Sequence, residues 1–243
     1  MSGEKRFLIV NDDGIKSEGL WILARAAEKF GKVWVVAPDS QCSGVSQKVT
    51  IFEPLTVLRQ ESPGPAEAAW SVSGMPADCV KVALKVLLDF RPDFVLSGVN
   101  NGFNAGYDTA YSGTVAAAME ALMNGIPALA FSMAYNRDTE TAETFLPALL
   151  EELLQKDPGP AGIWNVNFPG VPARDCKGIL YQRAIAPLQI YQDRFDCEDL
   201  EDGGLLLQNT GGRCHAEDAP EGSDIRAVLS DYISVGTLRC PVL

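Results

Sequence analysis

The chain has 243 residues, a formal net charge of −12 and an apolar fraction of 47%. This length and composition predict a globular protein with a substantial core, arranged as one large domain or as a domain with an extension. The acidic balance argues against a protein that grips nucleic acid polymers by their backbone, although it is compatible with a small phosphate ester. No stretch predicts a secretion signal or a membrane span, and the six cysteines form no CxxC pair. We therefore expect a cytoplasmic protein with reduced thiols and no membrane partner.

Strands and helices alternate through the first half of the chain. The apolar run at residues 7–10 predicts a buried strand, and the periodicity of residues 18–30 predicts a helix. A hairpin or two short edge strands are expected at residues 49–52 and 55–58. Further strands are expected at residues 33–37, 70–72, 93–96 and 128–131, with helices at 76–88 and 115–123. This alternation predicts an α/β fold with a doubly wound, mostly parallel sheet.

The second half has a different character. A helix is expected at residues 143–154 and a strand at 163–168, at the far edge of the sheet. Residues 177–214 predict a long hairpin or arm that forms an oligomer contact. A short helix at 224–229 and a strand at 231–238 end the chain. We accordingly expect a catalytic core at residues 1–175, and at residues 176–243 a C-terminal arm or hairpin with a terminal helix–strand segment that forms oligomers.

Oxygen-bearing side chains follow three of the predicted strands. Asp12 and Asp13 follow the first strand, Ser43 follows the second, and Asn100 follows the strand at 93–96. The carboxyl ends of parallel strands share one edge of the sheet, where ligands bind. Two carboxylates, a hydroxyl and an amide suit Mg²⁺, Mn²⁺ or Ca²⁺ better than zinc or copper. For the two aspartates alone, a solvated turn is the competing interpretation.

A small-residue helix begins after Ser112, Gly113 and Thr114. Hydroxyls and free backbone amides at a helix start make an anion site, although a plain N-cap, the competing interpretation of Ser112, is by itself commoner. A metal next to a helix N-terminus predicts an anionic substrate, most simply a phosphate. The chain has one histidine, His215, in a polar segment, so sites built on several histidines are not expected.

Seven motifs, in order along the chain, resemble the survival protein SurE family of metal-dependent nucleoside monophosphate phosphatases. Their order and spacing are more specific than any one of them. They are NDDGI at residues 11–15, APD at 37–39 with Ser43-Gly44 and Ser46, GMPADCV at 74–80, SGVN at 97–100 with Gly102 and Asn104, YSGTV at 111–115, NVNFP at 165–169, and SDI at 223–225 with YIS at 232–234.

The resemblance implies a Rossmann-like core and one divalent cation per subunit, Mg²⁺ or Mn²⁺. The residues that match the family's metal ligands are Asp12, Asp13, Ser43 and Asn100. The resemblance further implies hydrolysis of nucleoside 5′- and 3′-monophosphates, with short polyphosphate as a further substrate. It implies a homodimer or homotetramer that exchanges C-terminal segments. One departure concerns Gln41-Cys42, which stands where the family often has Asn-Arg, so a basic side chain near the substrate is missing.

These features together predict metal-assisted hydrolysis of a phosphomonoester. Ser112, Gly113, Thr114 and Asn104 would contact the phosphate, and Asp12 or Asp13 would orient the attacking water. A covalent aspartyl-phosphate is the less favoured route. The alternative function is a non-catalytic nucleotide-binding regulator on the same fold. A dinucleotide-dependent oxidoreductase is disfavoured because NDDG replaces the glycine-rich turn that such enzymes carry after the first strand.

Overall fold

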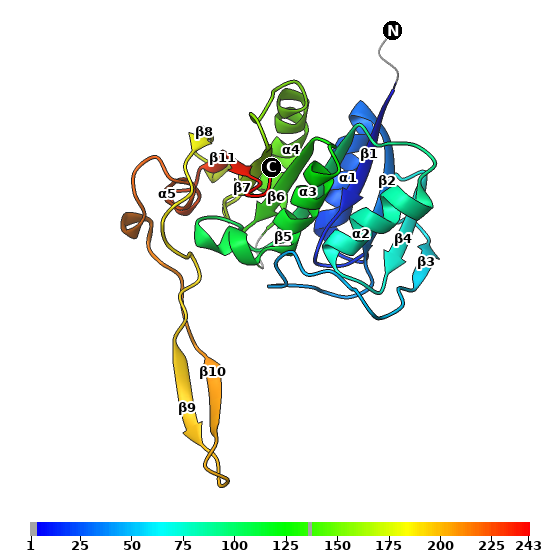
Figure 1. Cartoon of the computed structure of the whole chain (residues 1–243). Coiled ribbons are helices and arrows are strands. Elements are labelled where there is room, and N and C mark those ends of the chain that lie inside the picture. Colours follow the sequence, from blue (N-terminus) through cyan, green and yellow to red (C-terminus); the bar gives the residue numbers. More distant parts are fainter. Residues whose placement is uncertain (1–3, 136–137) are drawn as a thin grey trace.

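The computed structural model describes residues 4–135 and 138–243 and contains one large twisted sheet with helices on both faces (Figure 1). Six neighbouring strands run parallel, β3 pairs antiparallel with β4, and β11 pairs antiparallel with β7. Among the described residues the sheet has nine strands, in the spatial order β3 (Val57–Gln60), β4 (Ala68–Val72), β2 (Gly31–Pro38), β1 (Lys5–Val10), β5 (Phe94–Asn101), β6 (Ala128–Met133), β7 (Gly162–Phe168), β11 (Ile233–Arg239) and β8 (Ile179–Arg183).

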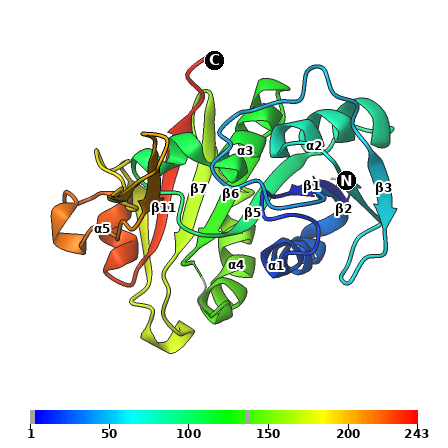
Figure 2. The same cartoon turned by 90° about the horizontal axis from the view of Figure 1, so that it is seen from below.

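Helices cover the sheet as two separate layers, which are visible on opposite sides of the strands in Figure 2. α1 (Glu18–Ala27) and α4 (Glu140–Leu153) pack on one face, and α2 (Pro76–Val82) and α3 (Gly113–Met123) pack on the other. Side chains of β1 alternate between the two layers, and all four residues from Phe7 to Val10 are wholly buried. This arrangement explains why β1 is a continuous apolar run in place of an alternating one.

The order of the strands reverses direction between β1 and β5. From β1 the chain passes through α1 to β2, whereas β4 connects back through α2 to β5 on the other side of β1. The connections leave β1 and β5 toward opposite faces, since α1 and α3 lie in different layers. A crevice outside the carboxyl ends of the strands is expected at such a reversal. The doubly wound, mostly parallel sheet predicted from the sequence is confirmed.

Three local expectations were wrong. Residues 49–52 form an exposed loop in place of a strand, held by Thr50, whose amide and hydroxyl both donate to Asp78. β5 continues to Asn101, because residues 97–99 are buried and the end of the strand pairs with β6. The strand at 163–168 is not at the edge, since β7 lies between β6 and β11.

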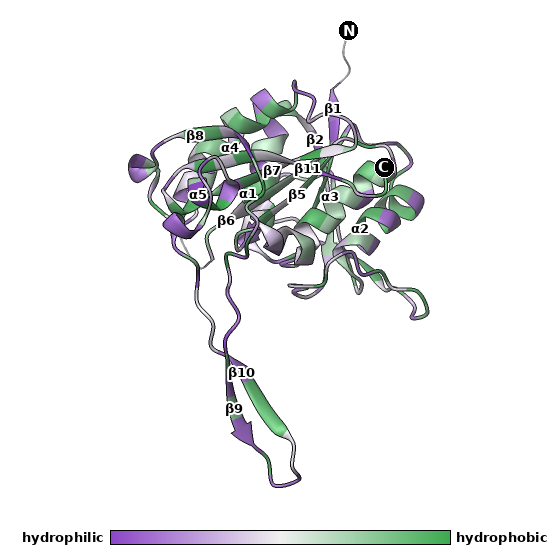
Figure 3. Cartoon of the chain, turned by 60° about the vertical axis from the view of Figure 1, so that its left-hand side comes forward, coloured by the Kyte–Doolittle hydropathy of each residue, from purple (hydrophilic) through white to green (hydrophobic). Residues whose placement is uncertain are grey.

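The last third of the chain supplies both sheet strands and a projecting ribbon. β8 and β11 join the large sheet, and α5 (Asp224–Leu229) packs beside β11, so the sheet spans the expected division at residue 175. β9 (Phe195–Asp199) and β10 (Leu205–Asn209) form a two-stranded antiparallel ribbon that extends far from the body, with apolar residues on β10 (Figure 3). Short 3₁₀ helices occur at Glu28–Phe30, Tyr107–Tyr111, Ala173–Asp175 and Ala216–Asp218. A π-helical turn, Ala83–Leu87, follows α2.

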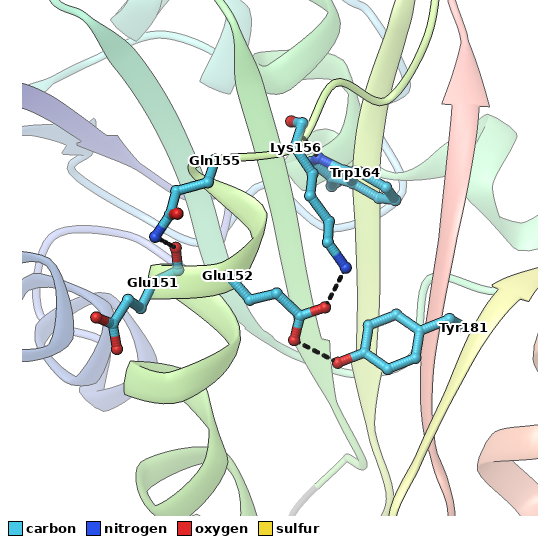
Figure 4. A network of polar contacts seen from close by, with 6 residues as sticks. All are labelled: Glu151, Glu152, Gln155, Lys156, Trp164 and Tyr181. Carbon is cyan, nitrogen blue, oxygen red and sulfur yellow. Dashed lines mark hydrogen bonds and ion pairs between the residues drawn. The ribbon is translucent and has the colours of Figure 1, made fainter.

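A polar network connects α4 to β8 near the far edge of the sheet (Figure 4). The carboxylate of Glu152 accepts hydrogen bonds from the Tyr181 hydroxyl at 2.6 Å and from the Lys156 ammonium at 2.5 Å. The Lys156 ammonium also lies 5.3 Å from the centre of the Tyr181 ring. These contacts fix the end of α4 against a strand that the chain reaches only after residue 175.

Candidate active site

A cavity of about 470 Å³ opens at the carboxyl ends of the strands, at the reversal between β1 and β5. Its wall contains five of the eight site residues predicted from the sequence, which are Asp12, Ser43, Asn100, Asn104 and Ser112. They come from three strand ends, the loop after β5 and the start of α3. The fold therefore gathers side chains that are up to 100 residues apart.

Asp12 lines this cavity and is 3% exposed. The Thr114 hydroxyl donates a 2.5 Å hydrogen bond to Asp12 Oδ1. Burial raises the pKa of Asp12 to about 6; the Thr114 hydroxyl and backbone amides oppose this rise, and the nearby charge of Asp13 adds to it. The carboxylate is therefore held in an environment that disfavours its negative charge.

Asp13 faces an adjoining cavity of about 400 Å³, which shares Gln41 and Asn101 with the first one. Its Oδ2 accepts a 2.8 Å hydrogen bond from the Asn101 amide. Burial raises the pKa of Asp13 as well. Within residues 4–135 and 138–243, no lysine, arginine or histidine forms an ion pair with Asp12 or Asp13. A buried carboxylate and a partly buried one thus stand next to each other without a positive side chain to balance them.

The loop after β2 brings Ser43 to the cavity together with Gln41, which was not among the predicted site residues. The Gln41 amide nitrogen donates a 3.0 Å hydrogen bond to Ser43 Oγ, and Gln41 lines both cavities. The neighbouring Cys42 is buried, and its backbone amide donates to the Asp12 carbonyl at 2.7 Å. Gln41 and Cys42 stood out in the sequence because they depart from the family pattern, but only the structure shows which groups they contact.

Asn100 and Asn104 reach the cavity from β5 and the loop that follows. The Asn100 amide nitrogen donates to the Gly102 carbonyl at 2.8 Å, so its Oδ1 is the atom suited to a cation. The Asn104 side chain donates to Ser132 at 2.8 Å, and its backbone amide donates to Asn167 Oδ1 at 2.9 Å. Asn104 is therefore fixed in place by the ends of β6 and β7.

The start of α3 adjoins Asp12 directly. Ser112 caps the helix, since its Oγ accepts a 3.0 Å hydrogen bond from the Val115 amide. A Cβ on Gly113 would lie 2.8 Å from Asp12 Cβ, so glycine is what allows the helix to approach so closely. Thr114 is wholly buried and is not part of the cavity wall, and its hydroxyl donates a hydrogen bond to Asp12. Of the four residues expected to contact phosphate, Asn104 and Ser112 line the cavity, whereas Gly113 and Thr114 do not.

The donor set fits a hard divalent cation. The carboxylates of Asp12 and Asp13, the Ser43 hydroxyl and the Asn100 amide oxygen are all oxygen ligands, which Mg²⁺ and Mn²⁺ prefer. Burial is the main cause of the raised pKa of Asp12, and a cation between the two carboxylates would offset the charge of Asp13 that adds to it. In the described part of the chain, no group of three or more histidine, cysteine, aspartate or glutamate side chains is placed to hold a metal. A thiolate or imidazole site of the zinc type is thus absent from these residues.

The model of the survival protein SurE family matches residues 7–187 of this chain. This span includes every residue of the cavity wall except Tyr191. The chain belongs to the survival protein SurE family. Residues 7–187 therefore carry the family's sequence pattern, and the family membership predicted from seven separate motifs is confirmed.

Relatives in the SurE family cover nearly the whole chain. The 5′-nucleotidase SurE of Gemmatimonas aurantiaca is 42% identical over 242 residues, which are 96% of this chain and 92% of that protein. The 5′-nucleotidase SurE of Chlorobaculum tepidum is 42% identical over 235 residues, 96% of this chain and 88% of the relative. The crystal structure of the SurE protein from Aquifex aeolicus has a TM-score of 0.82 and 35% identity, and covers 96% of this chain and 93% of its own.

The structural similarity to a SurE protein therefore extends beyond residue 187, where the family-model match ends. Among the described residues, no helix is both long and apolar enough to cross a membrane.

Proposed function

We propose that this protein is a metal-dependent nucleotidase that hydrolyses nucleoside 5′- and 3′-monophosphates to a nucleoside and phosphate. The relatives are named 5′-nucleotidases, which supports the class of reaction. The observation that carries the proposal is the pair formed by the buried Asp12 and the partly buried Asp13, neighbours in the chain that have no positive partner among the described residues and line two adjoining cavities. Short polyphosphate is proposed as a further substrate, because it presents the same terminal phosphate oxygens.

Asp12, Asp13, Ser43 and Asn100 are the proposed ligands of one divalent cation, Mg²⁺ or Mn²⁺. Their oxygen chemistry and the uncompensated charge of the two carboxylates support this assignment. When bound, the cation supplies positive charge that offsets the negative charge of the substrate phosphate. Without it, the two carboxylates would repel a phosphate that entered the cavity.

The start of α3 is the proposed phosphate cradle. The first amides of a helix have no acceptor within the helix, and its dipole favours an anion at this end. Ser112 lines the cavity and retains a hydroxyl proton that it can donate, because its Oγ accepts from Val115. The Gly113 amide and the Asn104 side chain are proposed as further contacts. Thr114 has two proposed roles. Its hydroxyl positions the Asp12 carboxylate, which the hydrogen bond between them supports, and its backbone amide contacts the phosphate.

Asp12 is the favoured group to orient the attacking water. It lines the cavity in which the substrate phosphate would lie, whereas Asp13 faces the adjoining one. A water held by this carboxylate would stand next to phosphorus, and the leaving alkoxide would depart toward the open side of the cavity. The non-catalytic regulator, which is the alternative function, gains no support from the relatives, whose names describe an enzyme.

Replacement of Asp13 tests the proposal. We expect Asp13→Asn to lower phosphate release from AMP in the presence of Mg²⁺ or Mn²⁺ by at least about a hundredfold, since half of the carboxylate charge is lost. Asp39→Asn is the matched control, because Asp39 follows β2 as Asp13 follows β1 but is exposed and outside both cavities. Wild-type turnover by a correctly folded Asp13→Asn protein would refute the metal site. Binding of AMP by the wild type without phosphate release would favour the regulator.

A homodimer or homotetramer is proposed on the basis of the ribbon. Every residue of β9 and β10 is exposed, including Phe195 and the three leucines Leu205, Leu206 and Leu207. An isolated two-stranded ribbon is only marginally stable in water, so a second copy of the chain is the proposed cover. In this proposal, residues 176–243 form the oligomer contact and also contribute β8 and β11 to the large sheet. All six cysteines are free thiols, which supports a cytoplasmic location.

A further inference from the structure

A long loop, residues 39–56, connects β2 to β3 and carries Ser43, one of the proposed metal ligands (Figure 1). Two of its apolar side chains are left in water, since Ile51 is 74% exposed and Phe52 is 94% exposed. Their burial therefore contributes little to holding the loop in place. Polar contacts with the body of the protein have to fix this part of the chain.

Two backbone hydrogen bonds hold the loop on either side of Ser43. The Cys42 amide donates to the Asp12 carbonyl at 2.7 Å, and the Ser46 amide donates to the Tyr111 carbonyl at 2.9 Å. Ser46 has a φ of 51°, in the left-handed region that residues other than glycine rarely adopt. Such a conformation persists only where the surrounding structure holds it. The loop accordingly needs a further anchor after Ser46.

Asp78 supplies this anchor from the first turn of α2. It is 3% exposed, and its Oδ2 accepts hydrogen bonds from the Thr50 amide at 3.0 Å and from the Thr50 hydroxyl at 2.8 Å. The same oxygen accepts from the Met75 amide at 2.9 Å, which fixes the carboxylate to the start of the helix. Within the described ranges no basic side chain forms an ion pair with Asp78. The buried charge therefore depends on these charge-assisted hydrogen bonds, and Thr50 provides those that come from outside the helix.

Gly74 gives the carboxylate its space. A Cβ on this residue would lie 3.0 Å from Asp78 Oδ2 and 2.7 Å from Leu55 Cδ2, near the far end of the loop. The Gly74 carbonyl oxygen also lies 3.9 Å from the sulfur of Cys42, which precedes Ser43. The turn before α2 thus contacts the loop next to Ser43 as well as at its anchor.

We propose that Asp78 is a positioning residue for the metal site. Through Thr50 it fixes the loop on which Ser43 stands, and so sets where the Ser43 hydroxyl lies relative to Asp12. Asp78 itself is outside the walls of both cavities, so it acts only through the loop. The inference rests on the proposed function, which makes Ser43 a ligand. Without the anchor, ordering of the loop is left to the cation, so cation affinity falls more than turnover at saturating cation.

The test measures Mn²⁺ affinity by calorimetry without substrate, and the Mg²⁺ concentration that gives half-maximal phosphate release from AMP. We expect Asp78→Asn to weaken Mn²⁺ binding about tenfold and Thr50→Val about threefold, whereas Thr50→Ser should bind as the wild type does. Turnover at saturating Mg²⁺ should fall less than about threefold. Thr56→Val is the matched control, because Thr56 ends the same loop, is exposed, and is held by its backbone amide, which donates to Ser73 Oγ at 2.8 Å.

Ser43→Ala decides whether Asp78 acts through the proposed ligand. If it does, Asp78→Asn weakens Mn²⁺ binding little further in a protein that already carries Ser43→Ala. Additive losses would overturn the proposal, as would wild-type Mn²⁺ affinity in both Asp78→Asn and Thr50→Val. The comparison of Thr50→Val with Thr50→Ser carries the test if Asp78→Asn does not fold. Absence of Mn²⁺ binding by the wild type itself would instead refute the metal site of the proposed function, and the positioning role with it.

Discussion

The hydroxyl of Thr114 donates a 2.5 Å hydrogen bond to Oδ1 of Asp12, which joins the start of α3 to the end of β1 across 102 residues. Thr114 is wholly buried and Asp12 is 3% exposed, so water cannot replace this bond. Among the contributions to the pKa of Asp12, this hydrogen bond is the largest that opposes burial. The helix proposed to hold phosphate thus also fixes one of the two carboxylates.

Replacement of Thr114 by valine tests that role. Valine has nearly the same shape but cannot donate, so we expect Asp12 to lose its orientation and kcat/KM for AMP to fall about tenfold to a hundredfold. Thr114→Ser keeps the hydroxyl and is expected to retain most of the activity. Equal activity in Thr114→Val and the wild type would show that the bond is structural only.

Gly113→Ala is expected to damage the same site for a steric reason. Alanine in place of a helical glycine gains about 1 kcal/mol of helix propensity. Here the new Cβ would stand 2.8 Å from Asp12 Cβ and 3.0 Å from both Asp12 Oδ2 and Pro76 Cγ. Because overpacking costs about 1–3 kcal/mol, we expect a net loss of stability and of phosphate release, measured by denaturant unfolding and AMP turnover. Gly212→Ala, whose Cβ would meet nothing within 4 Å, should change neither.

Addition of a divalent cation is expected to raise the melting temperature. A ligand at a hundred times its Kd stabilises the folded state by about 2.7 kcal/mol, which for a chain of this size corresponds to a rise of about 5–10 °C. Calorimetry with Mg²⁺ or Mn²⁺ measures the shift, and a chelator should reverse it. Asp13→Asn should abolish most of it, whereas Asp39→Asn should not. An identical shift in Asp13→Asn would place the cation elsewhere.

The Tyr181–Glu152 pair gives a pH-dependent prediction. Partial burial, then the hydrogen bond to Glu152 and the charge of that carboxylate, raise the pKa of Tyr181 from 10.0 to about 12. The pKa of Glu152 is lowered from 4.5, first by Lys156 and then by Tyr181. A pKa that is raised in the folded state contributes stability at pH values below the pKa of the unfolded state. This stability is lost as the pH rises through the pKa of the folded state. For Glu152 the contribution is present above pH 4.5 and is lost as the pH falls through the lowered pKa.

Tyr181→Phe should therefore lower the free energy of unfolding most between pH 4.5 and pH 10. The loss is expected to be about 0.5–1 kcal/mol, because the partly exposed carboxylate is screened by solvent. It should shrink as the pH rises from 10 toward 12. Urea unfolding of both proteins across this range measures it, and a loss that is constant at every pH would assign the effect to packing of the ring alone.

The ribbon leucines are expected to control assembly. Leu205 and Leu207 are both more than half exposed and lie on the same side of β10. Their joint replacement by serine removes apolar area that a second copy would cover, so we expect the molar mass from light scattering to fall below the wild-type value. Gln208→Ser on the same strand is the control. A mass equal to that of the wild type would exclude this face of the ribbon as the contact.

The sequence by itself determined the sheet and the chemistry of its edge. Buried parallel strands are apolar on both faces, and the turns that follow them carry oxygen-bearing residues. Residues 7–13 therefore predict both β1 and the carboxylates that follow it. The same local reasoning placed Ser43 and Asn100 at one edge of the sheet and identified Ser112 as the cap of α3, and the structure confirms both placements. These features depend on periodicity and turn chemistry within about ten residues.

Only the tertiary structure decided which distant groups meet. Nothing local distinguishes the Thr114 hydroxyl as a partner of Asp12, because the contact arises from the order β2-β1-β5-β6 and from the close approach that Gly113 allows. Tyr191 reaches the cavity only because β8 and β11 join the sheet and bring the root of the ribbon beside Phe103. Such contacts follow from the packing of whole elements, and the surrounding sequence carries no periodic signal for them.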